Sequence, residues 1–368
     1  MSIPFVTFLP MERELNDDIR AAFDRVYTRS WYIEGVEDEA FEKAFAEYCG
    51  AKYCVGVGNG LDALMLALKA LGIGEGDEVI VPSNTYIATA LAVTYVGATP
   101  VFVEPDIRTF NINPDLIEAA ITSKTKAIMP VHLYGQACDM TVVKAVAGKY
   151  NLSVIEDCAQ CHGAKWNGRF TGTEGTLSCF SFYPTKPLGA LGDAGAICTN
   201  DDILADKIRM LRNYGSRVKY HNESIGRNSR LDEIQAALLC VGLKHLNECN
   251  EIRLKIAQQY LNSIHNDKLK LPVINPKATH VFHLFPVLVD CQEKFQQYLL
   301  NNGIKTQVHY PIPPFEAECF RNTDAGVKDG DKMYPNSYYT AKHEVSLPIY
   351  SGMSESDVKA VIQAVNSY

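Results

Sequence analysis

Between residues 53 and 199, short apolar runs alternate with stretches of helical pattern, and this alternation constrains the fold more than any other feature of the sequence. The apolar runs are typical of buried strands and lie at residues 53–57, 78–82, 99–103, 126–131, 152–156 and 194–199. Helical patterns separate them at residues 61–71, 84–97, 114–121 and 140–150. Because apolar strands that alternate with helices need helices on both faces of the sheet, we expect an α/β fold with a large, mostly parallel sheet.

A long helical segment at residues 229–264 follows this alternation. Its apolar stripe at helical spacing is formed by Leu231, Ile234, Leu238 and Val241. We expect this helix to carry the chain from a large domain with an N-terminal helical arm, residues 1–245, into a smaller C-terminal α+β domain, residues 246–368. With 47% apolar residues in 368, the chain has enough material for both cores.

Composition argues against several classes of partner. The formal net charge is -8 and no block of lysine and arginine stands out, so neither nucleic acid nor an anionic membrane is favoured. No apolar run is long enough to cross a bilayer. The 11 cysteines are an odd number and the start MSIPFVTFLP lacks the pattern of a secretory signal, which favours free thiols in the cytoplasm. Cys158 and Cys161 have CxxC spacing without a second pair, so we expect no metal site.

Residues that directly follow the predicted strands are the candidate ligand contacts, because ligands of parallel sheets bind beyond the carboxyl ends of the strands. GNGLDA, residues 58–63, places small residues at the start of a buried helix, where free N–H groups and the helix dipole favour a phosphate. Asp157 and Gln160 follow the strand at 152–156, and Lys186 lies in a later loop, shortly after Ser181. Taken singly, these features also fit a tight glycine turn, a helix cap or ion pair, and a surface lysine.

One cofactor needs these parts together, and it is pyridoxal phosphate. It requires a lysine to hold its aldehyde as a Schiff base, a carboxylate to keep the pyridine nitrogen protonated, and a cup for the phosphate. A lysine held in such a place also carries protons readily, because desolvation or a nearby cation lowers its pKa. The order of GNGLDA, Asp157 and Lys186 along the chain therefore predicts a pyridoxal phosphate site.

With these residues in place, the sequence resembles the sugar aminotransferases of the DegT/DnrJ/EryC1/StrS family, which have the aspartate-aminotransferase-like fold (PLP fold type I). The resemblance covers nearly the whole chain and rests on WYIEGVEDEAFEKAFAEYCGAKYCVGVGNGLDALMLAL, VIEDCAQCHGA, SFYPTKPLGALGDAGA and GRNSRLDEIQAALL. Two positions depart from the family pattern: Leu61 stands where threonine or serine is common, and GDAG, residues 192–195, stands for the usual GEGG. Relatives with histidine in place of the lysine are dehydratases, so Lys186 favours transamination.

The resemblance implies a role for each matching residue. Lys186 and Asp157 would be catalytic, the first as the Schiff-base lysine and the second as the partner of the pyridine nitrogen. The remaining cofactor contacts would be Gln160 to the ring hydroxyl, Tyr86 stacked on the ring, and Ser181 with the backbone N–H groups of Gly60, Leu61 and Asp62 on the phosphate. Asn228 resembles a phosphate contact supplied by the neighbouring subunit, which implies a homodimer; on its own it reads equally as a helix cap.

The substrates follow from the same resemblance. It implies a nucleotide-linked keto sugar as acceptor and L-glutamate as amino donor. GNGLDAL, WYIEG and VHYPIPP are most similar to enzymes of dTDP-3-keto-6-deoxyhexoses, which indicates amination at C3 for a deoxyaminosugar of lipopolysaccharide O-antigen or S-layer glycan. Amination at C4 of a dTDP- or UDP-linked 4-keto sugar is the alternative. Tyr183, His309 and Tyr310 are candidate sugar contacts, with structural roles as the other interpretation.

Two further protein classes fit the sequence less well. A noncatalytic pyridoxal phosphate-binding protein would usually carry an added DNA-binding or partner domain, and no helix-turn-helix extension is evident. A nicotinamide-dependent dehydrogenase shares the alternating pattern, but GVGNG, residues 56–60, lacks the full GxGxxG spacing and no acidic residue follows at the required distance. The intact set of Asp157, Gln160 and Lys186 favours an enzyme.

Overall fold

The computed structural model describes residues 2–8, 13–321, 323, 325 and 329–368. Its α-helices are α2 (Asn16–Arg29), α3 (Val36–Cys49), α4 (Gly60–Ala70), α5 (Ile87–Tyr95), α6 (Met140–Tyr150), α7 (Asp202–Arg212), α8 (Glu233–Ser263), α9 (Gln292–Asn301), α10 (Gly330–Met333), α11 (Pro335–His343) and α12 (Glu355–Ser367). Its strands are β1 (Tyr53–Val57), β2 (Glu78–Pro82), β3 (Thr99–Val103), β4 (Thr125–Ile128), β5 (Ser153–Asp157), β6 (Lys165–Trp166), β7 (Arg169–Phe170), β8 (Leu177–Ser181), β9 (Gly195–Thr199), β10 (Ser216–Val218), β11 (His221–Asn222), β12 (Leu269–Lys270), β13 (Phe285–Val289) and β14 (Glu344–Leu347).

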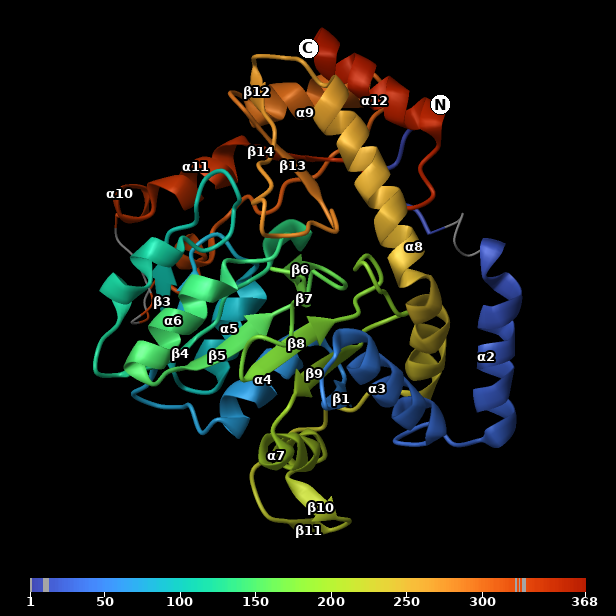
Figure 1. Cartoon of the computed structure of the whole chain (residues 1–368), viewed down its shortest axis with the longest axis vertical. Coiled ribbons are helices and arrows are strands. Elements are labelled where there is room, and N and C mark those ends of the chain that lie inside the picture. Colours follow the sequence, from blue (N-terminus) through green and yellow to red (C-terminus); the bar gives the residue numbers. More distant parts are fainter. Residues whose placement is uncertain (1, 9–12, 322, 324, 326–328) are drawn as a thin grey trace.

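A seven-stranded sheet in the order β1-β9-β8-β5-β4-β2-β3 forms the centre of the large domain (Figure 1). β9 pairs antiparallel with both β1 and β8, while the pairs from β8 through β5, β4 and β2 to β3 are parallel. Only β9 therefore runs against the others, and the predicted α/β fold with a mostly parallel sheet is confirmed.

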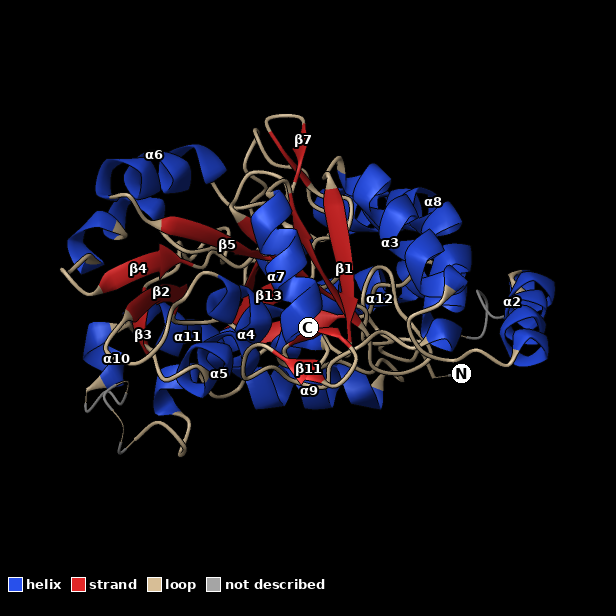
Figure 2. Ribbon diagram, turned by 90° about the horizontal axis from the view of Figure 1, so that it is seen from below, coloured by secondary structure: helices blue, strands red, loops and turns tan. Residues whose placement is uncertain are grey.

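Helices cover both faces of this sheet, as the apolar strands require (Figure 2). Alternation along β2 shows the reason: Val79 and Val81 face a core with α4 and α5, whereas Ile80 faces a second core with α6. α4 is buried almost all round because it lies between the sheet, α5 and α7. Asn59 caps α4 by accepting the Asp62 N–H at 2.8 Å, so the helix begins directly beyond the end of β1.

The helix predicted at residues 114–121 is wrong in type. The structure has two 3-10 turns there, η1 (Pro114–Leu116) and η2 (Glu118–Ala120), and Ile121 is already extended. The Asn113 side chain accepts the Asp115 N–H at 3.1 Å and starts the first turn at Pro114. A 3-10 turn rises more per residue than an α-helix, which suits a short connection that must return quickly to β4.

The smaller core contains the antiparallel sheet β12-β13-β14, packed against α9, α12 and the second half of α8. α8 runs without interruption from the large sheet to this core (Figure 1). Ile3 also packs into the smaller core and pairs with Ile304, while Phe315 and Phe320 pack into the core of the large sheet. The predicted boundary at residue 245 lies inside α8 and stays a prediction.

The cysteines and the length of the apolar helices were both the subject of sequence predictions. Eleven cysteines are free thiols. Within the described ranges, no helix combines the length and the apolarity that crossing a membrane would require.

Candidate active site

Asp157 is the last residue of β5 and is 5% exposed. Its Oδ2 accepts the Thr89 hydroxyl at 2.9 Å and its Oδ1 accepts the Ala159 N–H at 3.1 Å. Burial raises the pKa of this carboxyl above its ordinary 3.8, while those two hydrogen bonds and the charge of Lys186 oppose the rise. The result is an oriented, poorly solvated carboxylate that favours a cationic partner such as a protonated pyridine nitrogen.

Lys186 lies in the loop between β8 and β9, and the loop is closed by its own backbone. The Lys186 N–H donates to the Tyr183 carbonyl at 2.8 Å, and the Ala190 N–H donates to the Phe182 carbonyl at 2.8 Å. A Cβ at Gly189 would lie 2.3 Å from the Pro184 carbonyl oxygen, so the loop requires glycine there. Burial lowers the pKa of Lys186 from 10.5 to about 8, although Asp157 acts in the opposite direction. The neutral amine, which a nucleophile or a base needs, is therefore far more abundant near neutral pH than in an ordinary lysine, although the protonated form still predominates there.

The predicted phosphate turn and Ser181 meet at the same edge of the sheet. Ser181 ends β8 opposite Gly195, and Gly195 also lies opposite Val57 at the end of β1. A Cβ at Gly60 would lie 2.6 Å from Ser181 Cβ, and a Cβ at Gly195 would lie 2.6 Å from the Asn59 carbonyl carbon. The glycines are thus required for close approach, and Gly195 explains the end of the GDAG run.

The amides of this turn differ in what they offer. The Asp62 N–H already donates to Asn59, whereas the N–H groups of Gly60 and Leu61 make no hydrogen bond within the described chain. The Leu61 side chain packs against the core of the large sheet, so this residue offers only its backbone. Two open amides at the start of an 11-residue helix, beside the Ser181 hydroxyl, fit a phosphate.

Gln160, Tyr310 and Tyr86 form a connected set in front of Asp157. The Gln160 side-chain amide donates to the Tyr310 hydroxyl at 3.0 Å, and the rings of Tyr310 and Tyr86 lie 5.0 Å apart between centroids. Tyr86 is 53% exposed at the start of α5, so it is not a core-packing residue and its ring remains open to a ligand.

Tyr134 joins this set to His309, and the sequence did not indicate it. Its N–H donates to Gln160 Oε1 at 2.5 Å, and its hydroxyl donates to the His309 carbonyl oxygen. Tyr134 has φ 58°, a left-handed conformation that is costly for a bulky side chain and is held here by both hydrogen bonds. The only signal in the sequence was its position after a strand and before Gly135.

The three candidate sugar contacts differ in their surroundings. His309 and Tyr310 are partly buried. Burial lowers the pKa of His309 to about 4, and the charge of Lys186 acts in the same direction. The Tyr183 side chain is 52% exposed, and its carbonyl closes the lysine loop. His309 therefore lies within reach of the charge of Lys186, Tyr310 lies against Gln160, and Tyr183 belongs to the lysine loop itself.

Asn228 lies in the segment between the β10–β11 hairpin and α8, and its side chain is exposed. Its neighbours contact the phosphate turn of the same chain: Arg227 pairs with Asp62 at 2.8 Å, and the Ser229 hydroxyl accepts the Gly58 N–H at 3.0 Å. α8 begins at Glu233 with Asp232 at the cap position, so Asn228 does not cap this helix.

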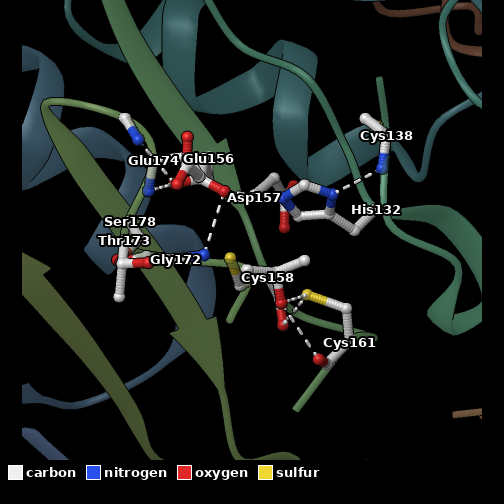
Figure 3. Close-up of polar contacts among 12 residues, drawn as sticks. His132, Cys138, Glu156, Asp157, Cys158, Cys161, Gly172, Thr173, Glu174 and Ser178 are labelled. Carbon is white, nitrogen blue, oxygen red and sulfur yellow. Dashed lines mark hydrogen bonds and ion pairs between the residues drawn. The ribbon is translucent and has the colours of Figure 1, made fainter. Parts of the chain in front are cut away.

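The buried cluster of His132, Cys158 and Cys161 has potential ligand atoms within 4.8 Å of one another (Figure 3). Nδ1 of His132 accepts the Cys138 N–H at 3.0 Å, and Nε2 lies 2.9 Å from the Glu156 carboxylate. That carboxylate also accepts backbone N–H groups from Gly172, Glu174 and Gly175. Both ring nitrogens are engaged, so the histidine offers no lone pair to a metal ion; it supports Glu156, which holds the loop between β7 and β8.

The fold and this arrangement of lysine, carboxylate and phosphate turn define a pyridoxal phosphate-dependent enzyme of the aminotransferase class. The family model of the DegT/DnrJ/EryC1/StrS aminotransferases matches residues 13–366. The chain belongs to this family, which confirms the predicted family, enzyme class and cofactor.

Individual relatives agree over whole chains. A dTDP-3-amino-3,6-dideoxy-alpha-D-galactopyranose transaminase of Aneurinibacillus thermoaerophilus is 52% identical over 100% of this chain and 99% of its own length. The crystal structure of DesV from S. venezuelae in complex with a ketimine intermediate superposes with a TM-score of 0.97 at 43% identity, covering 100% of this chain and 98% of DesV. NtdA of Bacillus subtilis, with bound cofactor PMP, has a TM-score of 0.89 at 32% identity over 99% of this chain and 85% of NtdA.

Proposed function

We propose that this aminotransferase transfers the amino group of L-glutamate to C3 of a dTDP-linked 3-keto-6-deoxyhexose, for the synthesis of a deoxyaminosugar of a surface glycan. The observation that carries the proposal is the pairing of a lysine of pKa about 8 with a buried, oriented carboxylate beside an open phosphate turn. The choice of C3 and of dTDP is supported by the 52% identical relative, whose name describes a 3-amino sugar carried by dTDP.

The chain's own residues supply positioning and proton transfer. When bound, pyridoxal phosphate supplies an electron sink for the charge left on a substrate carbon as its proton departs. Lys186 Nζ would hold the cofactor covalently, and its free amine would accept that proton and return it. Asp157, fixed by Thr89 and the Ala159 amide, keeps a proton on the ring nitrogen. Gly60, Leu61 and Ser181 hold the phosphate, and Asp62 contributes by fixing the turn through Asn59.

The remaining contacts divide between the ring and the sugar. Gln160 would bond the ring hydroxyl and Tyr86 would stack on the ring, while Tyr310 contacts both residues in the protein itself. Tyr183, His309 and Tyr310 would contact the sugar: the charge of Lys186 acts on His309, Tyr310 bonds Gln160, and the Tyr183 side chain is exposed beside the lysine loop.

The working unit in this proposal is a homodimer. Arg227 and Ser229 are turned to their own phosphate turn, so the exposed Asn228 between them is turned away from it. A two-fold axis near this edge would bring Asn228 to the phosphate of the other subunit. The free thiols and the nucleotide-sugar substrate fit a cytoplasmic enzyme.

The test uses the protein loaded with pyridoxal phosphate, L-glutamate and two acceptors, dTDP-3-keto and dTDP-4-keto 6-deoxyhexoses, in separate reactions. NMR locates the new amine in each product. An amine at C3 is expected. Turnover of only the 4-keto sugar, on dTDP or UDP, would establish the C4 alternative, and bound cofactor without turnover of any keto sugar would favour a noncatalytic protein.

A further inference from the structure

The strand β14 carries two buried polar side chains that the proposed chemistry has not used. Val345 and Leu347 face the smaller core, as alternate residues of a strand do. Glu344 and Ser346 lie on the opposite face and are both 0% exposed. Gln307 pairs antiparallel with Ser346, so the register places His309 across from Glu344 on that same face.

A continuous hydrogen-bond chain joins the three side chains. The His309 backbone N–H donates to Glu344 Oε2 at 2.6 Å, and Ser346 Oγ lies 2.5 Å from Glu344 Oε1. Ser346 Oγ also lies 2.9 Å from His309 Nδ1. The ring is held further by stacking on Phe5 at 5.7 Å between centroids. Nε2 of His309 makes no hydrogen bond within the described chain, so it is the ring atom available to a ligand.

No cation is paired with Glu344 among the described residues, so its carboxyl group exchanges protons through the hydrogen-bond chain to His309. The hydroxyls of Tyr134 and Tyr310 face its carboxylate, and on β13 its neighbours are the apolar residues Pro286 and Leu288. Gln292 of α9 bonds the backbone carbonyl of Glu344 and not its carboxylate. Among the described residues, no lysine or arginine forms an ion pair with that carboxylate. Lys186 is the cation that acts on His309, and the buried His283, whose pKa burial lowers well below its ordinary value, also lies within reach of His309. Burial raises the pKa of Glu344 to about 8, and the hydrogen bonds from His309 and Ser346 oppose the rise.

The two protonation states of Glu344 orient the chain in opposite directions. When Glu344 is ionised, Ser346 donates to it and accepts from Nδ1–H, so Nε2 of the neutral ring carries a lone pair. When Glu344 is protonated, it donates to Ser346, Ser346 donates to Nδ1, and the ring proton lies on Nε2. On protonation the Nδ1 proton passes through Ser346 to Glu344, and the proton taken up from solvent enters at Nε2.

We propose that Glu344 and Ser346 are positioning residues that set, through Nδ1, whether Nε2 of His309 meets a sugar hydroxyl as a hydrogen-bond donor or as an acceptor. The ligand named here rests on the proposed function, but the relay is a property of the chain's own residues. Preference for one arrangement of the sugar hydroxyls therefore changes with pH near the pKa of Glu344.

The direct test is the tautomer of His309 in pyridoxal phosphate-loaded protein labelled with 15N-histidine, with His309→Asn to assign the signal. In the wild type, as the pH rises through about 8, Nε2 is expected to release its proton to solvent while Nδ1 gains one from Glu344 through Ser346. Glu344→Gln imitates the protonated acid, so Nε2 stays protonated on both sides of that pH. Ser346→Ala breaks the chain and removes the coupled change.

A matched control is Glu104→Gln, which alters another buried carboxylate that accepts the Asn336 and Ser337 N–H groups at 2.7 and 3.2 Å. It should keep the wild-type tautomer change. A tautomer that does not follow pH in the wild type, or that still follows it in both Glu344→Gln and Ser346→Ala, overturns the relay.

Kinetics then connect the relay to the sugar. In Glu344→Gln, the pH dependence of KM for the keto sugar is expected to disappear, with a difference from wild type of roughly tenfold above the transition, while the half-reaction with glutamate is unchanged. Equal losses in both half-reactions would indicate a merely structural residue and overturn the proposal. A relay that switches in a protein that aminates no sugar would leave the relay standing and contradict the proposed function.

Discussion

Gly60→Ala tests the assignment of the phosphate turn, because the structure makes its cost specific. The added Cβ would lie 2.6 Å from Ser181 Cβ and 3.2 Å from Ser181 Cα. Ser181 ends a paired strand opposite Gly195, so it cannot move aside without disturbing β8 and β9. Relief of the contact must therefore come from the turn itself, which would carry the Gly60 and Leu61 amides away from the phosphate.

The cost therefore appears in binding. Overpacking of this kind costs about 1–3 kcal/mol, which corresponds to roughly 5- to 150-fold weaker binding of pyridoxal phosphate. The assay is titration of cofactor-free protein with pyridoxal phosphate, followed by visible absorbance, together with thermal unfolding of the same protein.

Gly148→Ala is the matched control, since it makes the same change in α6 where no atom lies within 4 Å of the new Cβ. It should bind the cofactor like the wild type and stabilise the fold by about 0.5–1 kcal/mol, because alanine is the better helix former. If Gly60→Ala bound pyridoxal phosphate as tightly as Gly148→Ala, the turn would not be the phosphate site.

Three further predictions follow from the same geometry. Uptake of pyridoxal phosphate by cofactor-free protein should speed up with pH and level off above about 8, since only neutral Lys186 attacks the aldehyde; stopped-flow absorbance measures this rate. The free energy of unfolding should also rise between that pH and 10.5, because the unfolded chain then binds more protons than the folded one, and unfolding at several pH values measures it. Thr89→Val should weaken cofactor binding by the roughly 1–3 kcal/mol of an unsatisfied buried acceptor on Asp157, whereas Thr89→Ser should restore it, as measured by the same titration. Mixing Asn228→Ala with Lys186→Ala protein should regain activity through mixed dimers with one intact site, and a mixture as inactive as its parts would refute a shared site.

The large sheet was predictable because its information is local. A run of apolar residues such as 78–82 predicts a buried strand, and the rule that ligands bind beyond the strand ends then indicated Asp157. Lys186 was not predictable from its own loop; it became so only beside Asp157 and the glycine turn. The error at residues 114–121 arose because a short helical pattern does not distinguish an α-helix from two 3-10 turns.

The missed residues share a different property, since each acts through a partner distant in the sequence. Thr89 bonds Asp157 across 68 positions and Tyr134 bonds the His309 carbonyl across 175, so no local pattern could reveal the pairs. Glu344 was not distinguished from an ordinary strand residue, because its contact with His309 depends on the register between β14 and the segment at Gln307. Contacts of this kind require the fold before they can be inferred.

These long-range contacts also determine how the two halves of the site depend on each other. Asp157, Gln160 and Lys186 belong to the large sheet, whereas His309, Glu344 and Ser346 come from the smaller core and its edge. Tyr134 connects them, because it bonds Gln160 through its N–H and the His309 carbonyl through its hydroxyl. A shift of the smaller sheet would therefore move His309 relative to the lysine and pull on Gln160 at the same time. The groups assigned to the sugar and those assigned to the cofactor are coupled through Tyr134 as well as through the direct Gln160–Tyr310 hydrogen bond, which is a physical reason for Tyr134 to be held in an otherwise unfavourable backbone conformation.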